Sequence, residues 1–158
     1  MKRRWAIIAA ALASVTMPAQ AAPKNDDKDL VALWYRAFES KDSSIFDRIL
    51  SDAWQDVPSA EDAPAGPPGA KAALMKLTGT FPDLTIQIED VLQDGNKVVV
   101  RSKISGSLRR PFLGVPANGQ NLSIQAIDIH EVQGGKIIRT WHTEDWMTGF
   151  RQLGVLGR

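Results

Sequence analysis

The sequence contains no cysteine. Disulfide bridges, thiol nucleophiles and thiolate metal ligands are therefore excluded, and any catalysis must use carboxylates, imidazoles, hydroxyls or the backbone. The chain also lacks an apolar run of the roughly 20 residues that a membrane span requires, so we expect no stable membrane insertion. No internal repeat is present. At 158 residues the chain suits one domain with a core that needs neither disulfides nor metal.

The first 21 residues have the composition of an export signal. Lys2-Arg3-Arg4 precede an apolar run from Trp5 to Met17, and Ala19-Gln20-Ala21 form a small-residue cleavage pattern. We predict a signal peptide over residues 1–21, cleavage after Ala21, and a periplasmic or secreted mature protein. The paired arginines leave the general secretory and twin-arginine routes both open. Of the 19 basic residues 16 remain after cleavage, against 18 acidic ones, so no nucleic-acid partner is indicated.

Two helices are predicted at the start of the mature chain. Residues 22–29 are polar and charged and are predicted to form a disordered leader. From Leu30 to Phe38 the apolar residues recur at helical spacing. Asp42 or Ser43 can cap a second, shorter helix over residues 45–50.

A loop and a third helix follow. The segment from Pro58 to Gly69 is rich in Pro, Ala, Gly and acidic residues, which is typical of a surface loop and suits a lid over a cavity mouth. Pro67-Pro68 suit the start of a helix that ends near Gly79. Trp54, before the loop, is placed in a brief strand.

The second half of the chain has the alternation of β-strands. Gly and Pro residues between 108 and 119 indicate a loop that separates two hairpins. Helices followed by antiparallel strands predict an α+β domain over residues 30–158, in which a curved sheet wraps around the helices. The strands are predicted from Leu84 to the turn at Asp94, from Lys97 to Ser107, from Leu122 to Val132 and from Lys136 to Trp146.

Chemistry-bearing side chains concentrate in the last two predicted strands. Both histidines of the chain, His130 and His142, lie there with the acidic residues Asp128, Glu144 and Asp145 and two of the five tryptophans. A carboxylate next to an imidazole fixes its tautomer and raises its basicity, which makes neutral histidine a general base near pH 7. We therefore place the candidate site on this hairpin.

Five segments of the chain resemble one protein family. They are Phe81-Pro82-Asp83-Leu84, Phe112-Leu113-Gly114-Val115-Pro116 with Gly119, Ile127-Asp128-Ile129, Gly135-Lys136-Ile137 and Gln152-Leu153-Gly154. In this order and spacing they resemble the SnoaL-like polyketide cyclase or ester cyclase group of the nuclear transport factor 2-like superfamily, over roughly Leu30 to Gly154.

This resemblance implies a fold, an activity and an assembly. The fold is a cone-shaped α+β domain, with three N-terminal helices on a strongly curved, mainly antiparallel sheet and an apolar small-molecule pocket inside. The activity is an aldol cyclisation that needs no cofactor and uses an acidic residue with a nearby histidine. Asp128 stands here in the place of that histidine and His142 in the place of that acid, so the pair is exchanged. Such folds commonly dimerise through the open face of the sheet, and we expect a homodimer.

The turn at Gly134-Gly135 decides whether Asp128 and His142 share a face of the sheet. A two-residue turn puts the two side chains on opposite faces, because side chains alternate along a strand. A three-residue loop with a bulge pairs Val132 with Lys136 instead and makes them diagonal neighbours, with backbones roughly 7 to 8 Å apart. We favour the second register.

In that register one face of the hairpin carries the candidate site. His142 is the predicted base, Asp128 its orienting carboxylate, and Glu144 a further catalytic candidate that can pair with His142. No cofactor is predicted, and no metal site, because the acidic and imidazole side chains are spread over both faces. Tyr35 or Trp146 is a candidate donor to a developing enolate oxygen. The predicted ligand contacts are Tyr35, Trp54, Ile124, Ala126, His130, Thr140 and Trp146.

Three functions remain open at this point. One is an exported enzyme that uses acid/base catalysis for proton transfer, aldol-type cyclisation or hydrolysis on an apolar carbonyl or ester compound. Another is a carrier or sensor that binds such a compound without turnover. The third is a domain that binds a partner through the open sheet face. Export argues against antibiotic polyketide synthesis, whose intermediates are held inside the cell.

Overall fold

The computed structural model describes residues 25–156. The predicted signal peptide, its cleavage site and residues 22–24 of the predicted leader lie outside the described residues. Helix α1 spans Asn25–Ser40. Residues 25–29, which we expected in a disordered leader, are therefore helical. None of the helices in the described range is long and apolar enough to cross a membrane.

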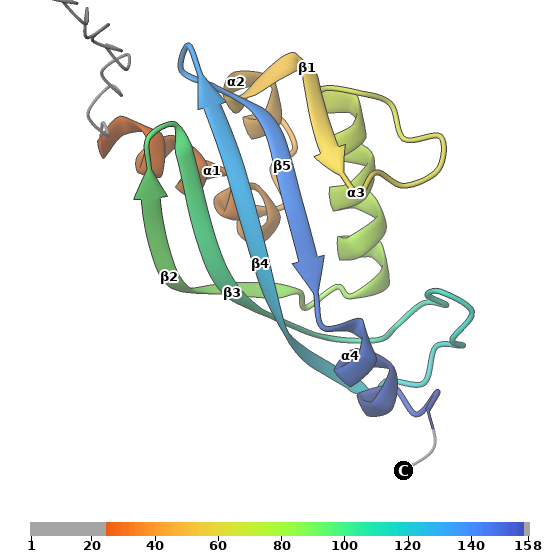
Figure 1. Ribbon diagram of the computed structural model, residues 1–158. Coiled ribbons are helices and arrows are strands. Elements are labelled where there is room, and N and C mark those ends of the chain that lie inside the picture. Colours follow the sequence, from red (N-terminus) through yellow and green to blue (C-terminus); the bar gives the residue numbers. More distant parts are fainter. Residues whose placement is uncertain (1–24, 157–158) are drawn as a thin grey trace, which may run out of the picture.

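Helices α1, α2 and α3 lie together on one side of a sheet (Figure 1). Helix α1 buries Val31, Tyr35 and Phe38, which recur at helical spacing and face the sheet. Helix α2 is short, Ile45–Ile49, and α3 spans Pro67–Thr80 with proline at its first position. The three predicted helices are confirmed.

The sheet has five strands in the order β1-β5-β4-β3-β2. Four strands form an antiparallel meander, while β1 pairs with β5 in parallel. The sheet stays open, and β3 and β4 bend along their length (Figure 1). The predicted α+β class with a mainly antiparallel curved sheet is confirmed. The strands are β1 (Leu50–Val57), β2 (Thr85–Asp94), β3 (Lys97–Ser107), β4 (Asn121–Gln133) and β5 (Lys136–Glu144).

The C-terminal end of the last strand differs from the prediction. Strand β5 ends at Glu144, and residues Trp146–Gln152 form a fourth helix, α4. Asp145 caps this helix, because its side chain accepts a hydrogen bond from the backbone N–H of Thr148 at 3.0 Å. The cap ends the strand at Glu144 and makes Trp146 the first residue of a helix, where it packs against the core.

The β4–β5 hairpin has a different register from the one we favoured. Gly134-Gly135 form a two-residue turn with φ angles of 59° and 75°, and Val132 pairs with Ile137. One extra residue of β5 then bulges out of the ladder, which shifts the pairing by one position. Asp128 consequently lies directly opposite His142. The two residues share a face of the sheet, as predicted. The predicted three-residue loop is wrong, however, because a two-residue turn and a bulge produce this register and make the two residues direct rather than diagonal neighbours.

The core lies between the inner face of the sheet and the helices. The even-numbered residues of β4 from Leu122 to Val132 are all buried, and the intervening ones are more exposed. An aromatic cluster of Trp34, Phe38, Phe46 and Trp54 fills the helical side, with ring centroids 5.1 to 5.8 Å apart. Each fully buried large side chain stabilises the fold by about 1.5 to 3 kcal/mol, so this cluster holds the helices on the sheet.

Candidate functional site

A cleft of about 680 Å³ opens beside the core, between β1, α3, the end of β5 and the loop that joins β1 to α3. Residues Ser59 to Ala65 of this loop form one of its walls. The lining is mainly apolar. The apolar and aromatic lining residues include Trp54, Val57, Ala72, Ala73, Leu77, Phe112, Leu113 and Trp146.

Two glycines hold the base of this loop against the fold. Gly66 has a φ of 72°, and its N–H donates to the Trp54 carbonyl at 2.8 Å. A Cβ on Gly66 would collide with the Asp52 carbonyl, and a Cβ on Gly69 would collide with the Pro64 carbonyl. Glycine is therefore required at both positions for the loop to reach the cleft.

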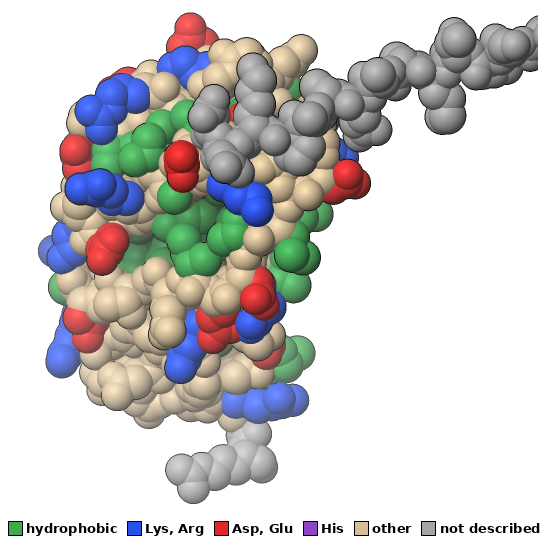
Figure 2. Space-filling view, turned by 90° about the vertical axis from the view of Figure 1, so that its left-hand side faces the viewer, with side chains coloured by type: hydrophobic (Ala, Val, Ile, Leu, Met, Phe, Trp, Pro, Cys, Tyr) green, Lys and Arg blue, Asp and Glu red, His purple; other side chains and the backbone are tan. Residues whose placement is uncertain are grey.

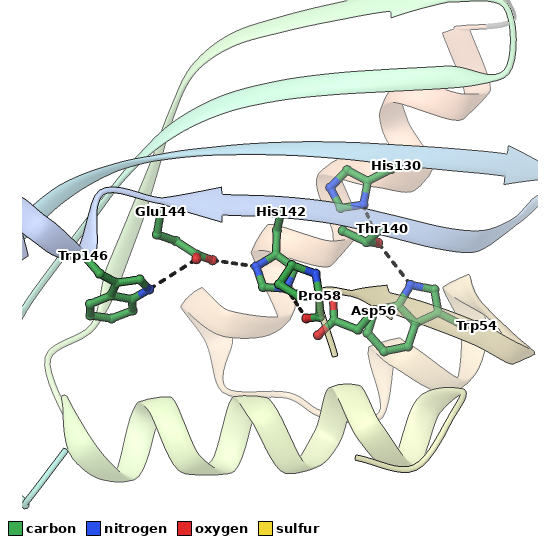
Figure 3. Close-up of polar contacts among 8 residues, drawn as sticks. All are labelled: Trp54, Asp56, Pro58, His130, Thr140, His142, Glu144 and Trp146. Carbon is green, nitrogen blue, oxygen red and sulfur yellow. Dashed lines mark hydrogen bonds and ion pairs between the residues drawn. The ribbon is translucent and has the colours of Figure 1, made fainter. Parts of the chain in front are cut away.

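His142 is the polar centre of the cleft wall (Figure 3). Its Nδ1 lies 2.9 Å from Oε1 of Glu144, and its Nε2 lies 3.0 Å from the Pro58 carbonyl oxygen. Oδ1 of Asp56 is 3.3 Å from the same Nε2. Glu144 also accepts a hydrogen bond of 3.3 Å from the Trp146 indole, so the carboxylate bridges the two rings.

These partners determine the protonation state of His142. A carbonyl oxygen can only accept a hydrogen bond, and a carboxylate likewise, so both ring nitrogens must carry a proton. The hydrogen bond to Glu144, together with the charges of Glu144 and Asp56, raises the pKa of His142 to about 9 although burial opposes this. His142 is an imidazolium at neutral pH, and in this state it has no free lone pair with which to act as a base.

Asp56 is a site residue that the sequence analysis missed. It lies on β1, and the parallel pairing of β1 with β5 places it opposite Thr140 and within reach of His142. Burial raises the pKa of the Asp56 carboxyl, and the neighbouring His142 partly offsets this. The only signal in the sequence is a carboxylate at the end of a brief strand, and nothing in the sequence pairs that strand with β5.

A second polar group lies deeper, in the core. The Tyr35 hydroxyl donates to Oδ2 of Asp128 at 2.6 Å and lies 3.0 Å from Nε2 of His130. On the other side of that ring, Nδ1 of His130 lies 3.0 Å from the Thr140 hydroxyl, which in turn accepts the Trp54 indole N–H at 3.0 Å. The four hydrogen bonds form one continuous chain through the interior, which we call the buried chain.

The hydrogen bonds of the buried chain all run in one direction. The single proton of the Tyr35 hydroxyl goes to Asp128, so Nε2 of His130 must donate to Tyr35. Nδ1 of the neutral ring then accepts the proton of the Thr140 hydroxyl, which itself accepts the Trp54 indole N–H. Burial accordingly lowers the pKa of His130 to about 3 and keeps the ring neutral. Burial raises the pKa of Asp128 to about 6, against the effect of the Tyr35 hydrogen bond.

The predicted site residues thus divide into two groups. His142, Glu144, Trp54 and Trp146 line the cleft. Asp128 makes its hydrogen bond with Tyr35 and none with His142, so the predicted Asp128–His142 hydrogen bond is not formed. The predicted ligand contacts Tyr35, Ile124, Ala126, His130 and Thr140 are buried in the core and do not line the cleft.

A shallower hollow of about 580 Å³ lies at the opposite edge of the sheet, between α1 and β2. Figure 2 shows this side of the molecule, with hydrophobic side chains gathered in the middle and charged ones around them. Ala32, Ile86 and Ile88 line it, with Tyr35 at its inner end. Its lining includes one carboxylate, Glu39, and no imidazole, whereas His142 and four carboxylates line the first cleft. Between residues 25 and 156 no group of three or more acidic or histidine side chains is arranged to hold a metal ion.

The comparisons with known proteins agree with this architecture. The chain is similar to TsrD from Streptomyces laurentii, with 27% identity and a TM-score of 0.78 over 85% of this chain and 99% of the other. It is similar to wild-type IdmH from Streptomyces antibioticus, with 26% identity and a TM-score of 0.70 over 82% and 99%. A SnoaL-like polyketide cyclase from Agrobacterium tumefaciens shares the fold at 20% identity, with a TM-score of 0.70 over 81% and 98%. A search of curated proteins finds no match.

The helices, the open curved sheet and the cleft beside them define a protein of the nuclear transport factor 2-like α+β class. The sequence-family model of the SnoaL-like polyketide cyclases matches residues 28–153 of this chain. The chain belongs to the SnoaL-like polyketide cyclase family, as the five sequence segments predicted, and a role on a small molecule follows from that membership.

Proposed function

We propose that the protein is a cofactor-free acid/base catalyst that moves a proton at the carbon next to a carbonyl or ester group of a mainly apolar compound. The observation that carries this proposal is the His142 imidazolium, held between two carboxylates in the wall of an otherwise apolar cleft. Perturbed titratable groups in a cleft are typical of catalytic sites. The family membership agrees with chemistry on a small molecule.

The geometry suggests different roles from those predicted from the sequence. Asp56 is the proton acceptor, because it lines the cleft and its raised pKa brings its basicity closer to that needed at neutral pH. His142 stabilises the developing oxyanion: a substrate carbonyl that replaces the Pro58 carbonyl at Nε2 receives a charge-assisted hydrogen bond. Glu144 holds the ring in place through Nδ1.

Proton abstraction can be measured without knowing the natural substrate. The bicyclic ketone 2-tetralone has exchangeable protons next to its carbonyl, and their replacement by deuterium in D₂O is followed by NMR. We expect the protein to accelerate this exchange and Asp56→Asn to remove most of the acceleration, since general-base catalysis typically contributes about 10²- to 10⁴-fold. Asp52→Asn is the matched control, because Asp52 lies on the same strand, is exposed and does not line the cleft.

The same assay separates catalysis from binding. If the ketone binds and neither the wild type nor any variant accelerates exchange, the protein is a carrier and the catalytic proposal is wrong. If Asp52→Asn loses as much of the exchange acceleration as Asp56→Asn does, the assignment of Asp56 as the base is wrong. His142→Gln tests the oxyanion role, and we expect a loss of at least about 10²-fold, the typical effect of removing one oxyanion donor.

We also propose that the mature protein is exported to the periplasm or secreted. The family match begins at residue 28, which leaves the basic and apolar N-terminal segment outside the matched domain. Expression of the full chain followed by cell fractionation and N-terminal sequencing tests this. A mature N-terminus at Ala22 in the periplasmic or extracellular fraction is expected, and an intact N-terminus in the cytoplasm would contradict it.

A homodimer through the outer face of the sheet is a further proposal. One apolar side chain from each strand forms a row across this face, since Leu92 pairs with Val99, Val99 with Ile129, Ile129 with Trp141 and Trp141 with Val57. Leu92 is 67% exposed and Ile127, in the next row, is 41% exposed. Light scattering is expected to give a dimer mass for the wild type and a monomer mass for Leu92→Lys/Ile127→Lys. A monomeric wild type at about 100 µM, well above typical dimer dissociation constants, would contradict the dimer.

A further inference from the structure

The charged side chains that line the cleft are mostly acidic. Four carboxylates line it, and they face two positive groups, Lys76 and the His142 imidazolium. The carboxylates are Asp56, Glu61, Asp62 and Glu144. The two inner ones, Asp56 and Glu144, lie 3.3 and 2.9 Å from the ring nitrogens of His142. Counted as charged groups, four carboxylates against two cations give the cleft a formal charge of −2, and Glu61 and Asp62 are the carboxylates that do not contact His142.

Glu61 and Asp62 lie side by side at the tip of the loop over the cleft. They are the central residues of a turn that is closed by a 3.1 Å hydrogen bond from the Ala63 N–H to the Ala60 carbonyl. Both side chains are exposed, and within residues 25–156 neither forms an ion pair. They are available to pair with a charge on a ligand.

The loop sets the distance between these carboxylates and the reactive centre. Pro58, whose carbonyl accepts from His142, is three residues from Glu61 and four from Asp62. An extended chain spans at most about 3.6 Å per residue, so the turn lies within about 14 Å of the Pro58 backbone. This upper limit admits a molecule of two or three fused rings. A ligand of this size can have its carbonyl at His142 and its opposite end at the turn.

We propose that the cleft selects a mainly apolar carbonyl compound that carries a protonated amine, with the amine at Glu61 and Asp62 and the carbonyl at His142. This inference rests on the proposed function and adds the substrate class. Trp146 and Phe112, which line the cleft with ring centroids 5.2 Å apart, favour a flat ring and also attract a cation by its interaction with aromatic faces. Compounds with a carboxylate, or attached to a phosphate-bearing carrier, are disfavoured by the same carboxylates.

Three probes of one skeleton test the charge preference: 1-naphthylmethylamine, 1-naphthylmethanol and 1-naphthoate. Their dissociation constants are measured by calorimetry. We expect the amine to bind at least about threefold more tightly than the alcohol, and the carboxylate at least about threefold more weakly than the alcohol. Factors of this size correspond to the free energy that two solvent-exposed charge pairs typically contribute. Raising the salt concentration from about 0.02 to 0.5 M should reduce these ratios, because exposed charges are screened.

The variant Glu61→Gln/Asp62→Asn should abolish the preference without changing the affinity for the alcohol. Asparagine tolerates the positive φ of Asp62, 61°, so the turn is expected to keep its shape, and circular dichroism checks the fold. The control Asp29→Asn/Asp94→Asn removes the same charge from exposed positions on α1 and β2 and should keep the preference.

Each result has a defined meaning. Equal affinities for the three probes, a preference for the carboxylate, or a preference that survives in Glu61→Gln/Asp62→Asn overturns the inference and leaves the proposed function intact. Failure of all three probes to bind overturns both. Because the readout is binding, a loss of proton exchange in the Asp56 or His142 variants does not enter the result.

Discussion

The protonation of His142 is the property on which the proposed chemistry depends, and it can be measured directly. The chain has only two histidines, so the imidazole signals in an NMR pH titration are simple to assign. His142 is expected to titrate near pH 9, because Glu144 holds Nδ1, while His130 stays neutral down to about pH 3. Substitution of Glu144 by Gln removes the largest cause of the raised pKa and should lower it by at least about one unit.

The same shift makes the stability of the fold depend on pH. An unfolded histidine titrates near 6.5, so the extra stabilisation is fully present below pH 6.5 and is lost as the pH rises through about 9. At about 1.4 kcal/mol per pKa unit, the loss between these values is roughly 3 kcal/mol as an upper limit, since the side chain is 23% exposed. Over this pH range the loss in the free energy of unfolding should be smaller for the Glu144→Gln variant than for the wild type, by at least about 1.4 kcal/mol.

Urea unfolding at pH 6, 7.5 and 9 measures this difference. The control is Glu131→Gln, an acidic residue on the outer face of β4, paired with Arg139, which removes the same charge without contact to His142. A wild-type His142 that titrates near 6.5, or a Glu131→Gln variant that shifts His142 as much as Glu144→Gln, would refute the imidazolium and with it the oxyanion role.

Further predictions concern the loop and the buried chain. Gly69→Ala should displace the loop, because the added Cβ collides with the Pro64 carbonyl, and should weaken probe binding and destabilise the fold by about 1 to 3 kcal/mol. At Gly79 an added Cβ meets nothing within 4 Å, so the control Gly79→Ala should stabilise α3 by up to about 1 kcal/mol. Thermal unfolding and probe titration compare the two variants. Tyr35→Phe should cost about 1 to 3 kcal/mol in urea unfolding, because Asp128 and His130 lose a buried partner, and should raise the pKa of Asp128 further. His130 has a lowered pKa, so it destabilises the fold as the pH falls below 6.5, and a His130→Phe variant should show a smaller loss of stability between pH 6.5 and 4.

Local patterns predicted most of the elements in the described range. Helical spacing and the proline start identified α1, α2 and α3, and alternation with Gly-rich turns identified the four antiparallel strands. Two elements differ at their ends. The start of α1 contains polar residues that suit a leader as well as a first helical turn, and α4 begins where the Asp145 cap and the packing of Trp146 turn the chain out of β5. The Asp145 cap is a local contact, whereas the packing of Trp146 against the core is a tertiary one, which overrides weak local preference.

The candidate site was predicted in part. His142 and Glu144 were identified because imidazole and carboxylate lie two apart on one strand, and Trp54 and Trp146 because aromatic residues border pockets. Asp128 and His130 were grouped with them because the favoured register puts them on the same face of the hairpin, but the structure directs both into the core, where Tyr35 satisfies them. Asp56 was missed because β1 reaches β5 only through a parallel pairing between segments about 85 residues apart.

The sequence by itself determined the class of fold, the family and the kinds of chemistry that are open, since these depend on composition, periodicity and short motifs along the chain. Only the tertiary structure decided which carboxylate meets which imidazole. A bulge of one residue in β5 sets which residue lies opposite Asp128, and the parallel edge strand brings Asp56 and the Pro58 carbonyl to His142. Hydrogen bonds form only at about 3 Å, so such contacts depend on register and packing that no local pattern encodes.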